Sequence, residues 1–177
     1  GKLYFLKYPI KDSDAHITVA TTRPETMLGD AAVAVNADDK RYKNLIGKTI
    51  LLPLTTREIP IVADEYVDAA FGTGAVKITP AHDPNDFEAG RRHGLPQVVV
   101  IGFDGKMTAE AGAVYAGLER GAARKKVLAD LREQGLRRDD KPHTSAVGRC
   151  QRCDTVLEPL VSRQWFVKIK PLADKAV

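Results

Sequence analysis

The chain has 177 residues, 44% hydrophobic and 28% charged, which is typical of a folded globular protein and argues against intrinsic disorder. Its formal net charge of +4 is compatible with contact to a phosphate backbone without requiring it. No apolar run approaches the roughly 20 residues that cross a bilayer, and the N-terminus lacks the layout of a signal peptide. We therefore expect a soluble, cytoplasmic protein with no membrane contact.

Short β-rich runs alternate with clusters of Gly, Pro, Asn and Asp from Lys2 to about Val100. Such a pattern is typical of short strands joined by turns. It predicts a barrel or a sandwich, with strands at residues 3–8, 17–21, 48–52 and 59–63.

A first polar segment follows the second predicted strand. Thr22 and Glu25 have the spacing of a capping box, which predicts a short helical turn that ends at Gly29. Arg23 and Thr26 are three residues apart and would share one face of that turn. From local spacing alone, the segment is equally well explained as a plain corner between a strand and a helix.

A second polar segment begins with FGTG, which lacks the remaining residues of a phosphate-binding loop. Residues 75–79 then alternate like a strand, with Val76 and Ile78 directed to the core and Lys77 and Thr79 to the opposite face. Without further context, that second face would simply be solvated.

A helix start follows directly. Asp83 is a favoured N-cap, proline follows it, and Asp86 lies where a capping-box acid would lie, while Gly94 would end the helix. Capping alone could explain both acids, because a first-turn carboxylate also suits the helix dipole.

A longer amphipathic helix is predicted between Gly117 and Gly135. Its apolar positions near helical spacing are Leu118, Ala122, Val127, Leu128 and Leu131. After Asp140 the chain is expected to be extended again.

Metal-binding patterns are weak. Cys150 and Cys153 have the spacing of one half of a tetrahedral zinc site and cannot complete it alone, so they are either an orphaned half-site or two surface thiols. His82 and His93 belong to no HExxH-type pair, which favours packing or surface roles over metal ligation. We expect no metal in this chain.

Two segments carry a family resemblance: ATTRPETMLGD at 20–30 and FGTGAVKITPAHDPND at 71–86. Both resemble the editing domain inserted into class I aminoacyl-tRNA synthetases for aliphatic amino acids, and they are most similar to the valyl enzymes. The resemblance implies a single α+β domain over 1–177 with a β-barrel core and peripheral helices. Residues 141–177, including SRQWFVKIKPLA, would form the strand-like return segment toward the synthetase body.

The resemblance also implies roles for individual residues. Asp86 would hold the α-amino group of the substrate, and Lys77 would stabilise developing charge, so these two are the predicted catalytic residues. Asp83, Thr79 and Thr26 would join Asp86 in binding the amino acid. The tRNA 3′ end would be bound by Thr22, Arg23, Phe71 and Lys77; Phe71 could stack on the terminal adenine, or it could equally be a core residue.

The implied activity is hydrolysis of the ester in threonyl-tRNA(Val). An apolar synthetic pocket rejects threonine poorly, and valyl enzymes are themselves the standard example of this limit. No cofactor is expected for editing, since ATP would serve only the absent aminoacylation domain, whose HIGH and KMSKS signatures the sequence lacks. The expected partners are the tRNA(Val) 3′ end carrying threonine and the rest of the synthetase chain. The alternatives are a noncatalytic tRNA-binding module, supported by the basic residues of the long helix, and an isoleucyl or leucyl editing domain.

Overall fold

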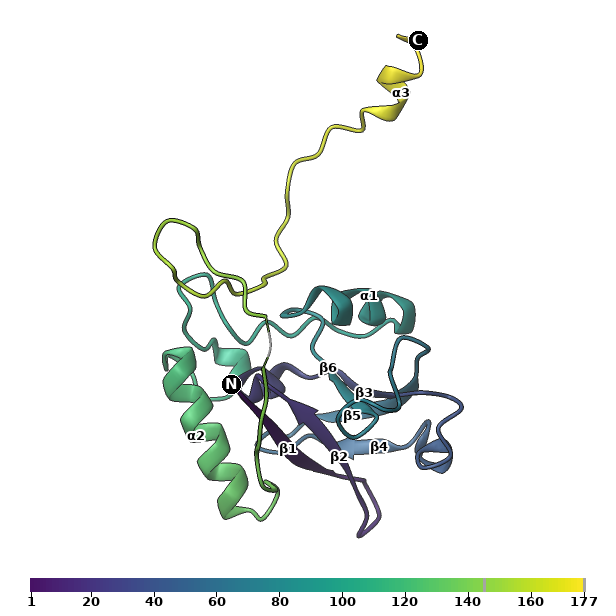
Figure 1. Cartoon of the computed structure of the whole chain (residues 1–177), viewed down its shortest axis with the longest axis vertical. Coiled ribbons are helices and arrows are strands. Elements are labelled where there is room, and N and C mark those ends of the chain that lie inside the picture. The colour runs from purple at the N-terminus through teal and green to yellow at the C-terminus, as the bar shows by residue number, and fades with distance from the viewer. Residues whose placement is uncertain (145, 177) are drawn as a thin grey trace.

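Two β-sheets form the centre of the computed structural model, which describes residues 1–144 and 146–176 (Figure 1). The first sheet has the order β2-β1-β7 and is antiparallel, whereas the second has the order β4-β5-β3-β6 and contains one parallel pair, β3 with β5. The strand bounds are β1 Lys2–Pro9, β2 His16–Thr21, β3 Ala32–Val35, β4 Thr49–Leu51, β5 Glu58–Ala63, β6 Ala75–Ile78 and β7 Lys141–Pro142. All four strand regions predicted before residue 64 are therefore confirmed.

The mixed α+β class is confirmed, but the predicted barrel is wrong, because the two sheets are not closed on each other. Strand β2 packs against β6 across the gap between the sheets without pairing with it in the ladders of the described residues. On the other side, an isolated bridge links Ile10, which follows β1, to Ile50 of β4. Barrel closure needs a continuous ladder of hydrogen bonds, and side-chain packing takes its place here.

The core lies between the sheets and under the long helix. Strand β3 is buried at every position, so its sequence AVAV has no polar face, as expected for a strand covered on both sides. Its neighbours in the core are large aliphatic and aromatic side chains that are almost inaccessible to solvent. The largest of them include Leu6, Tyr8, Ile17, Met27, Leu28, Ile50, Leu52, Ile61, Ile101 and Leu131.

Helices flank this core. The two longer ones are α1, Pro84–His93, and α2, Arg120–Glu133, and the 3-10 turns are η1 Pro24–Gly29, η2 Lys43–Leu45 and η3 Ala109–Ala111. The predicted helix near 118–134 is confirmed as α2, with Ala123 buried where Ala122 was expected. Helix α2 packs against η1, which brings its first turns close to the first polar segment.

After β7 the chain runs back along the body of the molecule, where Glu158 forms ion pairs with Arg23 and Arg120, and its last part then extends away (Figure 1). The predicted strand within SRQWFVKIKPLA is wrong: residues 162–169 have no regular structure, and Lys170–Ala173 forms a helical turn, α3. A strand requires a pairing partner, and the side chains here are exposed, Trp165 and Phe166 among them. The role of 141–177 as a return segment stays a prediction. No helix in the described ranges is long and apolar enough to span a membrane.

Candidate functional site

The predicted site residues gather around one cavity of about 320 Å³ between the two sheets. Its lining residues come mainly from the end of β2, from η1, from β6 and from the start of α1. All eight predicted residues line it: Thr22, Arg23, Thr26, Phe71, Lys77, Thr79, Asp83 and Asp86. Segments separated by about fifty residues in sequence therefore meet at one place, although their roles stay predictions.

The ammonium of Lys77 forms the floor of the cavity and is fully hydrogen-bonded. Lys77 in β6 and Thr79 just after the strand share a face as predicted, but this face is buried, not solvated. Lys77 Nζ donates to Thr26 Oγ1 at 2.9 Å, to Asp30 Oδ1 at 3.0 Å and to Thr79 Oγ1 at 2.6 Å. Because an ammonium has three protons, these contacts use all of them.

Asp30 is the partner that makes this buried lysine tolerable, and sequence reasoning missed it. Its side chain is completely buried and accepts hydrogen bonds from Tyr8 at 2.7 Å and from the Thr79 hydroxyl at 2.6 Å. Burial raises the pKa of Asp30, while Lys77 and the hydroxyl donors oppose that rise. The sequence does carry a signal for this pair: Asp30 lies between two apolar runs, MLG and AAVAV, which indicates burial. A buried charge needs a partner.

Asp86 is the buried carboxylate that lines the cavity. Its Oδ2 accepts from Thr79 N at 2.9 Å, and its Oδ1 accepts from the Tyr66 hydroxyl at 3.2 Å. Burial raises the pKa of Asp86 to about 6, against the lowering effects of Lys77 and of the Thr79 amide. Its position in the first turn of α1 is confirmed, but its carboxylate turns away from the helix start toward β6.

Asp83 is the N-cap of α1, as predicted. Its Oδ1 accepts from Asn85 N at 2.8 Å and Asp86 N at 3.2 Å, and Gly94 ends the helix in the left-handed conformation with φ 63°. Both capping bonds use one oxygen, so Oδ2 receives no hydrogen bond from the described residues. Capping and contact with a ligand are therefore compatible at Asp83.

The capping box predicted for the first segment is wrong. Arg23 occupies the N-cap position of η1 without a side-chain cap, and Glu25 is buried against Arg124, which donates from Nε at 2.7 Å and from Nη2 at 2.8 Å. A bidentate charged pair outweighs a return contact to one backbone amide. The turn is held instead by Thr26, whose hydroxyl donates to Arg23 O at 3.0 Å, and by Thr21, whose hydroxyl accepts from Arg23 N at 3.0 Å.

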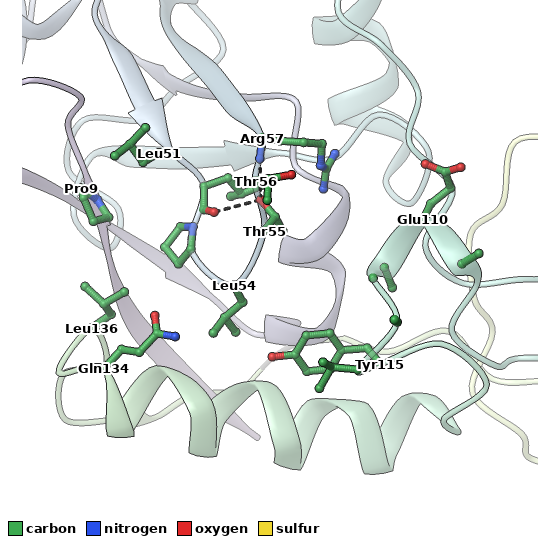
Figure 2. A pocket seen from close by; sticks show the side chains of 17 residues that line it. Pro9, Leu51, Leu54, Thr55, Thr56, Arg57, Glu110, Tyr115, Gln134 and Leu136 are labelled. Atoms are coloured by element: carbon green, nitrogen blue, oxygen red, sulfur yellow. Dashed lines mark hydrogen bonds between the residues drawn. The ribbon is translucent and has the colours of Figure 1, made fainter.

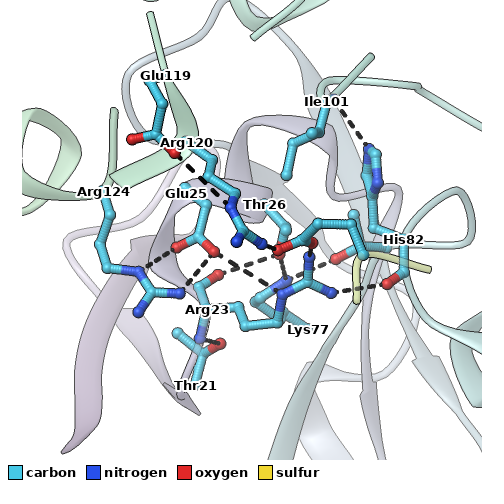
Figure 3. A network of polar contacts seen from close by, with 12 residues as sticks. Thr21, Arg23, Glu25, Thr26, Lys77, His82, Ile101, Glu119, Arg120 and Arg124 are labelled. Carbon is cyan, nitrogen blue, oxygen red and sulfur yellow. Dashed lines mark hydrogen bonds and ion pairs between the residues drawn. The ribbon is translucent and has the colours of Figure 1, made fainter. Parts of the chain in front are cut away.

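His82 supports the wall of the cavity. Its Nε2 accepts from the backbone amides of Val100 at 2.9 Å and of Ile101 at 3.3 Å; Figure 3 shows the contact with Ile101. Because an accepting Nε2 carries no proton, the ring is neutral with its proton on Nδ1. Burial, with the nearby charges of Arg23 and Lys77, lowers the pKa of His82 to about 4. Its accepting nitrogen is thus already in use.

Phe71 lies at the mouth of the cavity. Its side chain is 53% exposed, so it is not a core residue, and its ring meets that of His143 edge-on with centroids 6.1 Å apart. His143 comes from the C-terminal segment and also lines the cavity. Phe71 therefore offers an accessible aromatic face near the site.

Cys150 and Cys153 lie in a tight turn away from the cavity. Asp154 N donates to Cys150 O at 2.8 Å, and the amide of Cys150 donates to Thr155 O at 2.9 Å. Over 1–144 and 146–176, no group of three or more His, Cys, Asp or Glu side chains is placed to hold a metal. The half-site interpretation stays a prediction.

Comparison with known proteins decides the family. The chain is 61% identical over all 177 residues to a valine–tRNA ligase of Carboxydothermus hydrogenoformans, and 58% identical to that of Thermotoga maritima. This chain belongs to the valine–tRNA ligase family. It spans 20% of the length of each of these relatives, and a profile described as "Leucyl-tRNA synthetase, editing domain" matches residues 44–123. The chain is therefore the editing-domain portion of the valine–tRNA ligase architecture.

Solved structures of leucyl-tRNA synthetases share the fold of this valine–tRNA ligase editing domain. One, from Agrobacterium radiobacter K84 in a ternary complex with tRNA and LeuAMS, has a TM-score of 0.66 at 20% identity and covers 89% of this chain and 24% of its own. The crystal structure of GlLeuRS-CP1 has a TM-score of 0.61 at 12% identity and covers 81% of this chain and 100% of its own. Such identities establish the fold alone, whereas the much higher identity to valine–tRNA ligases places the chain on the valyl side. The leucyl or isoleucyl alternative is thus not supported.

Proposed function

We propose that this chain hydrolyses the ester of threonyl-tRNA(Val) after transfer, in the small polar cavity between the sheets. The observation that carries the proposal is the buried Asp86 carboxylate beside a cavity of about 320 Å³, the lower end of the range for small-molecule sites. A carboxylate held in a fixed position can pair with the positively charged α-ammonium group of an aminoacyl ester.

Selectivity for threonine is assigned to Asp83. Its free Oδ2 would accept a hydrogen bond from the threonine hydroxyl, with Thr79 and Thr26 completing a polar wall. Valine has a methyl group at that position, so binding it would desolvate these groups without replacing their hydrogen bonds. The expected preference is therefore for the hydroxylated side chain.

The chemistry is attack of a positioned water on an ester that is already activated. The water oxygen forms a bond to the carbonyl carbon, the bond to the ribose oxygen breaks, and that oxygen takes up a proton, which leaves free threonine and a tRNA hydroxyl. The neighbouring ribose hydroxyl and nearby polar groups would assist. Lys77 supplies positive charge to the floor while its protons hold Thr26, Asp30 and Thr79, so we assign it an electrostatic role without direct contact to the oxyanion.

We assign binding of the tRNA end to the residues at the mouth of the cavity. Phe71 would stack on the terminal adenine, and Thr22 and Arg23 would contact the ribose and phosphate. The other proposed partner is the remainder of the synthetase chain, toward which the exposed segment with Trp165 and Phe166 would return. The proposed setting is the cytoplasm, and no cofactor takes part.

The test is the deacylation rate of threonyl-tRNA(Val) against valyl-tRNA(Val), with the chain in excess and a chelator present. The proposal predicts rapid, chelator-resistant loss of threonine only. The same pair of esters is then given to the full-length synthetase with and without Asp86→Asn. Salt-sensitive tRNA binding with no Asp86-dependent hydrolysis in either form would overturn the proposal and leave a recognition module.

A further inference from the structure

Three arginines from two distant parts of the chain converge next to the cavity, which Arg23 lines. Arg23 precedes η1, whereas Arg120 and Arg124 lie on the first turns of α2, and Figure 3 shows the three guanidinium groups directed toward one another. Like charges at such close quarters require acidic partners. The buried Glu25 supplies one, through its bidentate contact with Arg124.

Glu158 supplies the other and joins the two remaining arginines. Its carboxylate forms ion pairs with Arg23 through Nη2 and with Arg120 through Nη1. The Glu158 side chain is only 17% exposed, whereas Leu157 beside it is 58% exposed. Glu158 therefore fixes the C-terminal segment to the mouth of the cavity by its charge, with little apolar packing next to it.

The other described acids near Arg23 and Arg120 form weaker ion pairs with them than Glu158 does. Glu25 is engaged by Arg124 and lies 3.8 Å from Arg23 Nε, while Glu119 lies 3.7 Å from Arg120 Nε. Arg23 also donates to the backbone oxygen of His82 at 2.8 Å, which fixes the direction of its guanidinium. Without Glu158, two oriented guanidiniums would face an anion-sized gap next to the cavity.

Guanidinium pairs bind phosphate oxygens with the same fork geometry that they use for carboxylates. We propose that Arg23 and Arg120 form a clamp for one RNA phosphodiester, and that Glu158 occupies this clamp until RNA displaces it. The ligand is a phosphate of the strand next to the terminal nucleotide. This inference rests on the proposed function only in placing that nucleotide in the cavity.

Exchange of a carboxylate for a phosphate makes Glu158 a competitor of RNA. Removal of its charge should strengthen RNA binding, and removal of Arg120 should weaken it. Because both effects act through the same contact, they should not add. A general effect of net charge would add, and it would also arise from charges elsewhere on α2.

The experiment measures binding of a short fluorescein-labelled single-stranded RNA ending in CCA, by fluorescence anisotropy over a range of salt concentrations. Glu158→Gln is compared with Glu133→Gln, which changes the net charge equally at an exposed position of α2. We expect about tenfold tighter binding for Glu158→Gln, equivalent to about 1.4 kcal/mol, and no comparable gain for Glu133→Gln.

A second pair tests the clamp from its basic side. The logarithm of the RNA affinity falls linearly with the logarithm of the salt concentration. Arg120→Gln should make this slope less steep by about 0.7, the value for one phosphate contact on a single strand, and Arg132→Gln should not change it. In the Arg120→Gln background, the gain from Glu158→Gln should be smaller, because Glu158 then blocks Arg23 alone. Equal gains from Glu158→Gln and Glu133→Gln, or an undiminished gain in that background, would overturn the clamp.

These outcomes are separable from the fate of the proposed function, because the binding assay has no hydrolytic readout. A chain that binds RNA through the clamp but removes no threonine would contradict the editing activity alone. A chain that removes threonine, but whose RNA affinity is unchanged by Glu158→Gln, would contradict the clamp alone. Thermal unfolding of each variant confirms that it is folded.

Discussion

Two cavities of this molecule differ in size and in chemistry, and the smaller one carries the proposed activity. The larger, of about 690 Å³, lies between the 51–57 loop, the 109–115 loop and the end of α2, and is lined mainly by apolar side chains (Figure 2). Two of its polar side chains are engaged elsewhere: Tyr115 donates to Asp130 at 2.6 Å, and Arg57 donates to the Leu28 carbonyl. In the smaller cavity, by contrast, carboxylates and an ammonium converge.

This contrast shows why volume alone is a poor guide to function. A reactive site needs charges that are held in place and only partly neutralised, and such groups carry shifted pKa values. Asp86 meets this description, whereas the larger cavity, an apolar groove, offers surface for packing. Substitutions in one region, with substitutions elsewhere as controls, separate the two cavities by function.

The largest effect is expected at Asp86. Asp86→Asn keeps the shape of the side chain and removes its charge, so the α-amino group of the substrate loses its partner. We expect kcat/KM for threonyl-tRNA(Val) to fall by about 100-fold or more, as for loss of one member of a buried charged pair. The control is Val114→Ser in the groove, 62% exposed, which should leave the rate unchanged. A larger loss of kcat/KM in Val114→Ser than in Asp86→Asn would indicate that the reactive site is the groove.

The next effect is on stability, at the floor of the cavity. Asp30→Asn removes the counter-charge of buried Lys77 and directs an amide donor at groups that already donate. We expect about 3–5 kcal/mol less free energy of unfolding in urea. Glu58→Gln breaks the exposed Lys11–Glu58 pair and should change little. Equal losses in the two variants would contradict a structural role for the floor network.

The acid limb of the pH profile gives a smaller, graded effect. The pKa of Asp86 is raised to about 6, and only the carboxylate pairs with an ammonium, so kcat/KM should fall about tenfold per unit below pH 6. Because the folded pKa exceeds the unfolded value, the contribution of Asp86 to the free energy of unfolding increases as the pH falls from 6 toward 4. Loss of activity in this window is therefore not acid unfolding at Asp86.

The residual rate of Asp86→Asn serves as the reference for this profile. It should show no inflection near pH 6, since the titrating group is gone. An unchanged acid limb in this variant would assign the inflection to another group and remove the main electrostatic argument for Asp86.

The smallest effect is expected at the cysteine turn. Cys150→Ser with Cys153→Ser should leave both the deacylation rate and the unfolding temperature of this chain unchanged, because the turn lies outside both cavities and is held by backbone hydrogen bonds. A loss of stability in the double variant, together with a zinc-dependent stability of the unaltered chain, would contradict this expectation.

Local chemistry explains which features the sequence could predict. The cap at Asp83, the stop at Gly94 and the alternation around Lys77 depend on neighbours within a few residues, and each is present in the structure. The Lys77–Asp30 pair instead depends on β3 lying beside β6. No periodicity within either segment specifies that pairing.

Glu25 shows how a distant partner can override a local pattern. Its spacing from Thr22 matches a capping box, yet Arg124, 99 residues away, takes its carboxylate. The barrel prediction failed for a related reason, since strand number and alternation do not determine whether edge strands β2 and β6 will pair. Both outcomes are set by tertiary packing.

The most direct test of the proposed function is a crystal structure of this chain with a threonyl-adenosine analogue in which an amide replaces the hydrolysable ester. We predict that the ligand lies in the smaller cavity, with its ammonium within hydrogen-bonding distance of Asp86 and its side-chain hydroxyl directed at Asp83. An analogue bound in the apolar groove, or bound with its ammonium away from Asp86, would contradict the central claim.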